Sequence, residues 1–99
     1  MISTPLIAAP PPGMCGGYSA ASVNRDVRAV ASFAVKTEAI NSGETLRLSK
    51  VLQAEKQVVA GTNYRLEIKV KRPSMTQTAQ AVVWKKLDGS YILTSWNWL

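Results

Sequence analysis

The sequence predicts an α+β fold, in which an antiparallel sheet of four strands, or of five, wraps around one N-terminal α-helix. Two observations carry this prediction: one segment has apolar residues at helical spacing, and the segments after it alternate apolar and polar residues. Short connections between successive strands favour antiparallel pairing, with the helix covering one face. Ninety-nine residues suit one domain, which we place at residues 18–99 behind a flexible Pro/Gly-rich arm at residues 1–17.

The helix is predicted over residues 22–37. Apolar residues recur there at intervals of three and four, which places them on one face of a helix. Ser22 is the predicted N-cap, and a polar cluster ending in Gly43 is the predicted stop signal. The expected apolar face consists of Val23, Val27, Val30 and Ala34.

Four strands are predicted after the helix. The first, at residues 46–55, alternates regularly except at Lys50, which indicates a bulge. The second, at residues 64–71, has the clearest alternation in the chain. The third and fourth, at residues 79–86 and 90–98, are joined by a turn with an Asp-Gly pair, which is typical of hairpins. The residues expected on the core face are Leu46, Leu48, Leu52 and Ala54 in the first strand and Tyr64, Leu66, Ile68 and Val70 in the second.

The composition predicts a protein that is not an enzyme and needs no cofactor or metal ion. The chain has no histidine, the commonest general base and metal ligand. Its single cysteine, Cys15, can form neither an internal disulfide nor a Cys-His pair. The six carboxylates are spread singly, and the glycines follow no phosphate-binding pattern. A binding function therefore explains this chain better than catalysis does.

The formal charge of +6 attracts acidic partners without naming one. The cations are scattered along the sequence, with the closest groupings at Lys69, Lys71 and Arg72 and at Lys85-Lys86. A nucleic-acid footprint is usually a stripe or a clustered run, so nucleic acid is not the expected partner. The N-terminal segment has no basic region before its apolar run, and no segment has the roughly twenty apolar residues of a membrane span. We therefore expect a cytoplasmic protein with no membrane association, with a mature secreted chain as the alternative.

Three segments are small, apolar or rich in glycine: Gly16-Gly17, Gln57-Val58-Val59-Ala60-Gly61 and Leu87-Asp88-Gly89. The middle segment, QVVAG, matches in full the QxVxG first hairpin loop of the cystatin superfamily, whose members inhibit papain-like cysteine proteases. The glycine pair matches the one near that family's N-terminus. The sequence therefore resembles a cystatin over roughly residues 15–98, with features similar to the stefins and to other disulfide-free cystatins. The third segment departs from the Pro-Trp pair of many cystatins.

The resemblance implies a reversible, tight-binding, competitive inhibitor in which the three segments form a wedge that plugs the active-site cleft of cathepsin-type proteases. Gly61 would permit the return of the loop, and Gln57 would bridge its base or contact the protease. The chain is expected to be a monomer that can exchange strands into a domain-swapped dimer. The alternative is a non-inhibitory basic binding module of the same fold, with an acidic protein or a nucleic acid as partner. The three tryptophans, Trp84, Trp96 and Trp98, are predicted to lie in strands.

Overall fold

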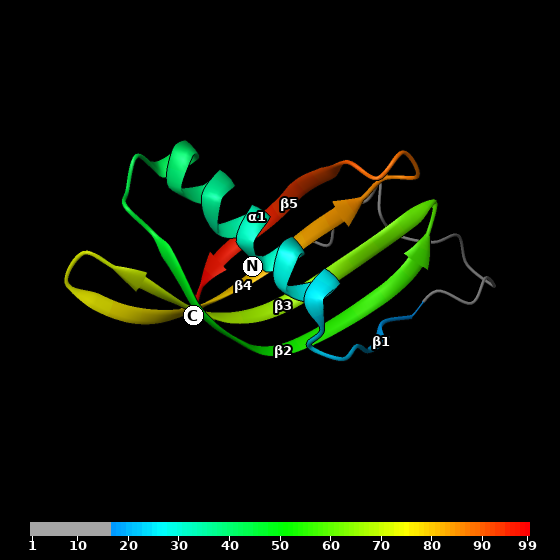
Figure 1. Ribbon diagram of the computed structural model, residues 1–99, viewed down its shortest axis with the longest axis horizontal. Coiled ribbons are helices and arrows are strands. Elements are labelled where there is room, and N and C mark those ends of the chain that lie inside the picture. Colours follow the sequence, from blue (N-terminus) through cyan, green and yellow to red (C-terminus); the bar gives the residue numbers. More distant parts are fainter. Residues whose placement is uncertain (1–16) are drawn as a thin grey trace.

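The computed structural model describes residues 17–99 of the chain. Its elements are β1 (Ser19–Ala20), α1 (Arg25–Ser42), β2 (Arg47–Val59), β3 (Gly61–Arg72), β4 (Met75–Lys85) and β5 (Tyr91–Trp98). The strands form one five-stranded antiparallel sheet in chain order, and α1 crosses one face of it (Figure 1). The predicted α+β fold is confirmed, with β1 as the fifth strand. Of the predicted arm, only Gly17 is described; Cys15 and Gly16 lie outside the described residues.

α1 begins later than predicted. Asn24, not Ser22, is the N-cap, and its side-chain oxygen accepts a hydrogen bond from the Val27 main-chain N–H at 2.9 Å. The chain just before the helix is held to the sheet, because the Ala21 N–H donates to a β2 carbonyl at 2.9 Å, so the helix cannot start at Ser22. Val23 consequently precedes the helix and is 41% exposed, so its predicted core position was wrong.

The predicted stop signal of the helix is confirmed. The helix ends at Ser42, and Gly43 follows with φ 74°, a left-handed conformation that glycine adopts without steric cost. As the only helix within residues 17–99, α1 lacks the length and apolar character that crossing a membrane requires.

β2 contains the bulge predicted near Lys50 and a second one that was not predicted. The pairing register with β3 shifts between Leu48 and Lys50 and again between Val51 and Gln53. Each extra residue reverses the faces of the residues that follow it. Val51 is therefore buried in the core, and Leu52 is 38% exposed, which corrects the prediction for Leu52.

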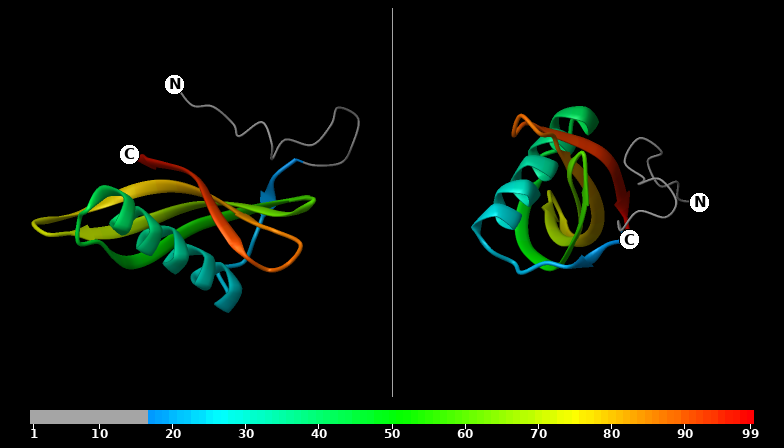
Figure 2. Two further views of the ribbon diagram at one scale, coloured as in Figure 1. Left: turned by 90° about the horizontal axis from the view of Figure 1, so that it is seen from above. Right: turned by 90° about the vertical axis from the view of Figure 1, so that its right-hand side faces the viewer.

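The core lies between α1 and the concave face of the sheet, which curves around the helix (Figure 2). Leu66, Ile68 and Val70 of β3 are fully buried, as predicted, and Tyr64 packs against the same cluster. Small residues on the inward face of α1 let its backbone approach the sheet closely. The buried residues of the helix are Val27, Val30, Ala31, Ala34 and Val35.

Arg72 closes the core at the end where β5 finishes. Its guanidinium binds both carboxylate oxygens of Glu44 at 3.0 and 2.9 Å and lies 4.2 Å from the centroid of the Trp98 ring. Trp96 packs edge-on against Trp98, with ring centroids 5.2 Å apart. The predicted strand positions of the three tryptophans are confirmed.

Candidate functional site

The QVVAG segment forms the end of the β2–β3 hairpin and is less of a loop than the sequence indicated. Gln57, Val58 and Val59 belong to β2, and Gly61 starts β3, directly paired with Val59. Ala60 alone stands outside the two strands. Val58 is 68% exposed, so the hairpin presents a narrow tip with an apolar side chain beside it.

Gly61 meets two separate demands at this tip. Its φ of 93° is a left-handed conformation that returns the chain, as predicted, and that disfavours residues with a Cβ. In addition, a Cβ at this position would overlap the main-chain oxygen of Lys85 and lie 3.1 Å from Nε1 of Trp84. The tip is therefore packed directly against β4, and only glycine allows that approach.

Trp84 braces the tip from the neighbouring strand. Its indole Nε1–H donates a hydrogen bond of 2.8 Å to the main-chain oxygen of Ala60. Sequence reasoning placed Trp84 in a strand but missed this contact. The signal lies in the strand register: Trp84 pairs with Asn63, which puts it two residues along from Gly61.

Gln57 and Asn63 hold the base of the tip. They are cross-strand partners, and the Asn63 side-chain N–H donates to the Gln57 side-chain oxygen at 3.0 Å. Gln57 is only 8% exposed and Asn63 is fully buried. Of the two roles weighed for Gln57, the structure shows the bridge, and little of its surface is left for contact with a partner.

The second turn is built by its acidic residue. The Asp88 carboxylate accepts hydrogen bonds from the Ser90 hydroxyl at 2.7 Å and the Ser90 main-chain N–H at 2.9 Å. These two bonds, the hydroxyl first, lower the pKa of Asp88 below its ordinary value. Gly89 takes a φ of 90°, and Leu87 projects into solvent with 84% of its surface exposed.

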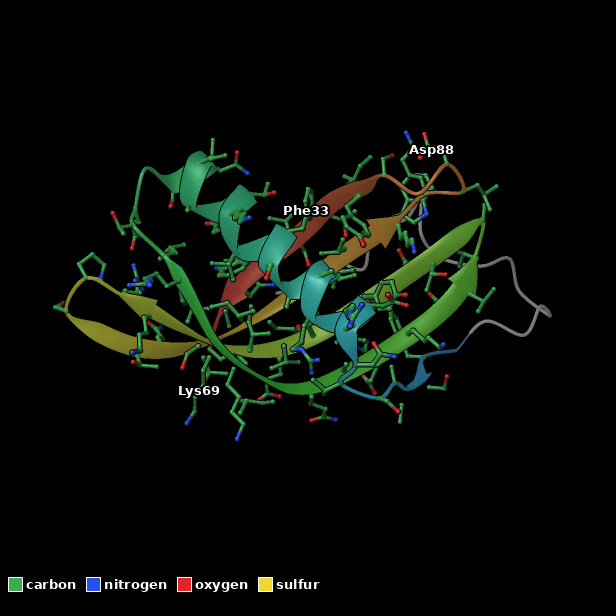
Figure 3. All side chains as sticks on the ribbon, in the orientation of Figure 1. Phe33, Lys69 and Asp88 are labelled. Carbon is green, nitrogen blue, oxygen red and sulfur yellow. The ribbon has the colours of Figure 1, made fainter. Side chains whose placement is uncertain are left out.

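The two turns share one recess. Ala60 of the first turn and Leu87 and Asp88 of the second line a recess of about 320 Å³, with Trp84 and Lys86 between them. The turns lie at the same end of the sheet, where Figure 3 labels Asp88 (Figures 1 and 3). The sequence predicted that both turns belong to the site, and the structure brings them together.

Gly17 and Tyr18 lie just before β1. Ser19 pairs with Lys56 in antiparallel register, so the chain from Ser19 back to Gly17 runs in the direction of the tip of β2. The Tyr18 ring lies beneath the Arg65 guanidinium, 4.0 Å from ring centroid to Cζ.

Charged groups around Tyr18 hold that stacking in place. Arg65 also binds Glu55 at 2.8 Å, which fixes the guanidinium over the ring. Burial raises the pKa of the Tyr18 hydroxyl, against the opposing effect of the Arg65 charge. The stack therefore anchors the chain next to Gly17 on the outer face of the sheet.

This end of the molecule, which we call the edge, comprises Gly17, the hairpin tip at Val58–Gly61 and the turn at Leu87–Gly89. It offers shape and apolar surface in place of reactive groups. In the described part of the chain, no group of three His, Cys, Asp or Glu residues could hold a metal ion. One helix inside a curved antiparallel sheet, with these three segments at one end, defines a cystatin-type protein.

Comparison with known proteins agrees with that class. The family model described as "Aspartic acid proteinase inhibitor" (SQAPI) matches residues 21–99, and the chain therefore belongs to this family, within the cystatin superfamily. Cysteine proteinase inhibitor 1 of Actinidia chinensis var. chinensis is 41% identical over 61 residues, covering 62% of this chain and 53% of that protein. Cystatin-C of Macaca mulatta is 39% identical over 71 residues, covering 69% of this chain and 49% of that protein.

A solved structure supports the fold. The crystal structure of a salivary cystatin from the soft tick Ornithodoros moubata superposes with a TM-score of 0.75 at 20% identity, covering 87% of this chain and 99% of the other. The chain spans about half the length of these two sequence relatives.

Proposed function

We propose that the protein is a reversible, tight-binding, competitive inhibitor of papain-like cysteine proteases, and that the edge enters their active-site cleft as a wedge. The braced tip carries this proposal: Ala60 is held by the Trp84 indole, and Gly61 is packed against Lys85. A tip that is already ordered loses little conformational entropy on binding. Two sequence relatives named as a cysteine proteinase inhibitor and a cystatin support the same target class.

The geometry of the tip explains how it would resist cleavage. A cysteine protease attacks a carbonyl carbon while donors of the enzyme stabilise the carbonyl oxygen. The oxygen of Ala60 already accepts the Trp84 N–H of its own chain, so this carbonyl is turned towards β4. The side chains of Val58 and Leu87, which are 68% and 84% exposed, supply apolar surface. Burying a fully exposed side chain of this size contributes about 1.5–3 kcal/mol, so each can contribute the corresponding share on binding.

Titration of papain with this protein tests the proposal. We expect stoichiometric loss of activity that returns on dilution and is relieved by excess substrate. Val58→Asp should weaken inhibition at least tenfold, because it places a charge at the tip. Met75→Asp, at an apolar position 52% exposed where β4 begins, at the end of the sheet far from the edge, should inhibit normally. Full papain activity at micromolar inhibitor, or cleavage of the tip as a substrate, would refute the proposal.

Aspartic proteinases are a second candidate target. The description of the matching family model, an aspartic acid proteinase inhibitor, favours this target class. The match covers residues 21–99, which include both hairpin ends and exclude Gly17. The same titration with pepsin separates the candidates. Inhibition of pepsin with no effect on papain would establish the second and overturn the first.

We further propose that the active form is the monomer and that its targets are cathepsin-type enzymes. A dimer that exchanges strands by straightening the hairpin at Ala60 would break the contact with Trp84 and bury the tip. Size-exclusion fractions assayed against a panel of cathepsins test both points, since inhibition should follow the monomer peak. Equal inhibition per chain in a dimer peak would contradict this assignment.

A further inference from the structure

A basic surface lies on the face of the sheet that points away from α1, at the end remote from the edge. Four cationic side chains stand there in two cross-strand pairs, Arg47 with Lys71 and Lys50 with Lys69, and we call them the basic patch. All four are exposed. Figure 3 shows the Lys69 side chain projecting from the sheet on the side away from the helix.

The basic patch places like charges opposite each other, and no carboxylate of residues 17–99 forms an ion pair with them, although Glu67 is the next outward-facing residue of β3 beside Lys69. Like charges directly opposite each other on paired strands destabilise a sheet. Within residues 17–99, none of the four side chains takes part in a hydrogen bond or an ion pair, whereas Arg65 and Arg72 bind Glu55 and Glu44. The four cations are therefore available to an anion from outside the chain.

The surroundings of the patch restrict the chemistry of that anion. On β4, Thr76 stands opposite Lys71 and Thr78 opposite Lys69, so hydroxyl groups extend both rows. The two rows contain no aromatic, apolar or acidic side chain. Single-stranded nucleic acids are held by stacking on aromatic rings, and protein partners by apolar and aromatic anchors, and the patch has neither.

The shape of the patch also disfavours duplex DNA. Arg47 and Lys50 lie on β2 and Lys69 and Lys71 on β3, and β4 runs beside β3, so the patch is part of a surface at least three strands wide. The major groove admits a helix or a two-stranded ribbon, and this surface is broader than either.

We propose that the basic patch binds an acidic polysaccharide, a linear chain in which carboxylate or sulfate groups recur among hydroxyls. The backbone positions that carry the cations are roughly 5 Å apart across the strands and roughly 7 Å apart along β3, from strand spacing and residue rise. Arg47 can bind an oxyanion through two N–H groups, and the lysines act as point charges. The threonine hydroxyls can hydrogen-bond the sugar hydroxyls.

The patch and the edge are separate surfaces. Lys50 lies nine residues before Val59 in β2, which is roughly 30 Å along a strand. A polysaccharide on the patch would leave the edge free for a protease. This inference therefore does not depend on the proposed inhibition.

Binding of the full chain to heparin and to polygalacturonate, measured by isothermal titration calorimetry at several salt concentrations, tests the inference. The informative variant is Lys69→Gln with Lys71→Gln. The control is Arg25→Gln with Lys36→Gln, which removes the same charge from exposed positions on α1. We expect at least tenfold weaker binding for the patch variant and less than a threefold change for the control. The logarithmic salt slope of the patch variant should fall by about one to two, by analogy with counterion release from nucleic acids.

Three results would overturn the inference: no salt-sensitive binding to either polysaccharide, equal loss in both variants, or tighter patch-dependent binding to oligothymidylate or phosphatidylserine vesicles. The last result would reassign the patch to nucleic acid or to a lipid surface. The patch variant should melt no lower than the parent, because it removes repulsion. If it does melt lower, Lys69→Arg with Lys71→Arg keeps the charge and must retain binding, and its failure to bind would also overturn the inference.

Discussion

The indole of Trp84 offers the sharpest test of how the hairpin tip is held. Trp84→Phe keeps an aromatic ring in β4 but deletes the N–H that donates to Ala60 at 2.8 Å. A hydrogen bond of this kind contributes about 0.5–1.5 kcal/mol, and because this one is exposed to solvent, the lower part of that range, about 0.5–1 kcal/mol, applies.

That free energy should appear as lost affinity for the protease. Without the brace, the tip must be ordered when it binds, and the cost is subtracted from the binding free energy. A loss of about 0.5–1 kcal/mol raises the inhibition constant about two- to fivefold. The inhibition constant against papain, measured from progress curves, gives the value directly.

Trp96→Phe is the matched control. The Trp96 Nε1 is buried and has no hydrogen-bond partner among residues 17–99, so this variant makes the same chemical change without deleting a hydrogen bond. It should inhibit like the parent even if its melting temperature shifts. Unchanged inhibition by Trp84→Phe, or an equal loss in Trp96→Phe, would show that the indole does not brace the tip.

Three further changes test other parts of the site. Gly61→Ala should raise the inhibition constant more than tenfold and destabilise the fold by at least about 1–2 kcal/mol, because a side chain there strains the backbone and also overlaps Lys85. Gly43→Ala is the control: Gly43 also has a positive φ but has open space around it, so this variant measures the cost of backbone strain without overlap. If both glycine variants lose the same stability and inhibit alike, the overlap is unimportant. Tyr18→Ala should weaken inhibition severalfold by releasing the chain beside Gly17, and Tyr18→Phe should restore it by keeping the ring under Arg65. Inhibition that does not respond to Tyr18→Ala would exclude that anchoring role. For Asp88, a lowered pKa means that its stabilisation of the turn is present above the ordinary aspartate pKa of about 3.9 and is lost as the pH falls through the lowered value. The Ser90 amide shift in NMR should therefore titrate below pH of about 3.9, and a midpoint above that value would contradict the hydrogen-bonded turn.

The fold class followed from local patterns that the structure preserves. The helical spacing, the Gly43 stop and the alternation in β3 each depend on residues near one another in the sequence. The errors arose where distant contacts decided between local alternatives. Ser22 and Asn24 are both good caps, and the hydrogen bond from Ala21 to β2 selects the later one.

The second bulge of β2 escaped prediction for a related reason. Leu52 and its neighbour Val51 are both apolar, so alternation alone cannot tell which of them faces the core. The register with β3 decides it, because Val51 pairs with Ile68 at the centre of the core. That choice depends on a strand that comes later in the chain.

In the candidate site, too, local sequence features were predicted and contacts between distant residues were not. The motif located the tip, and composition explained why it carries no reactive group. The brace from Trp84 and the close approach of Gly61 to Lys85 depend on the β3–β4 register, which no short motif contains. Motif reasoning identified the tip but could not predict the contacts that order it, because those contacts come from Trp84 and Lys85 on another strand.

The edge has no group whose chemistry is specific to one class of protease. Its one carboxylate, Asp88, is engaged by Ser90, and the rest is backbone and apolar side chains. Cysteine and aspartic proteases can therefore be distinguished at this surface only by the shapes of their clefts. If both classes bind the tip, Trp84→Phe must raise both inhibition constants by a similar factor, because the ordering cost belongs to the inhibitor and not to the target. If an aspartic protease binds elsewhere on the fold, only the constant for the cysteine protease will move. The ratio of the two factors therefore tells whether one edge serves both classes, and it is insensitive to stability because the same folded protein enters both assays.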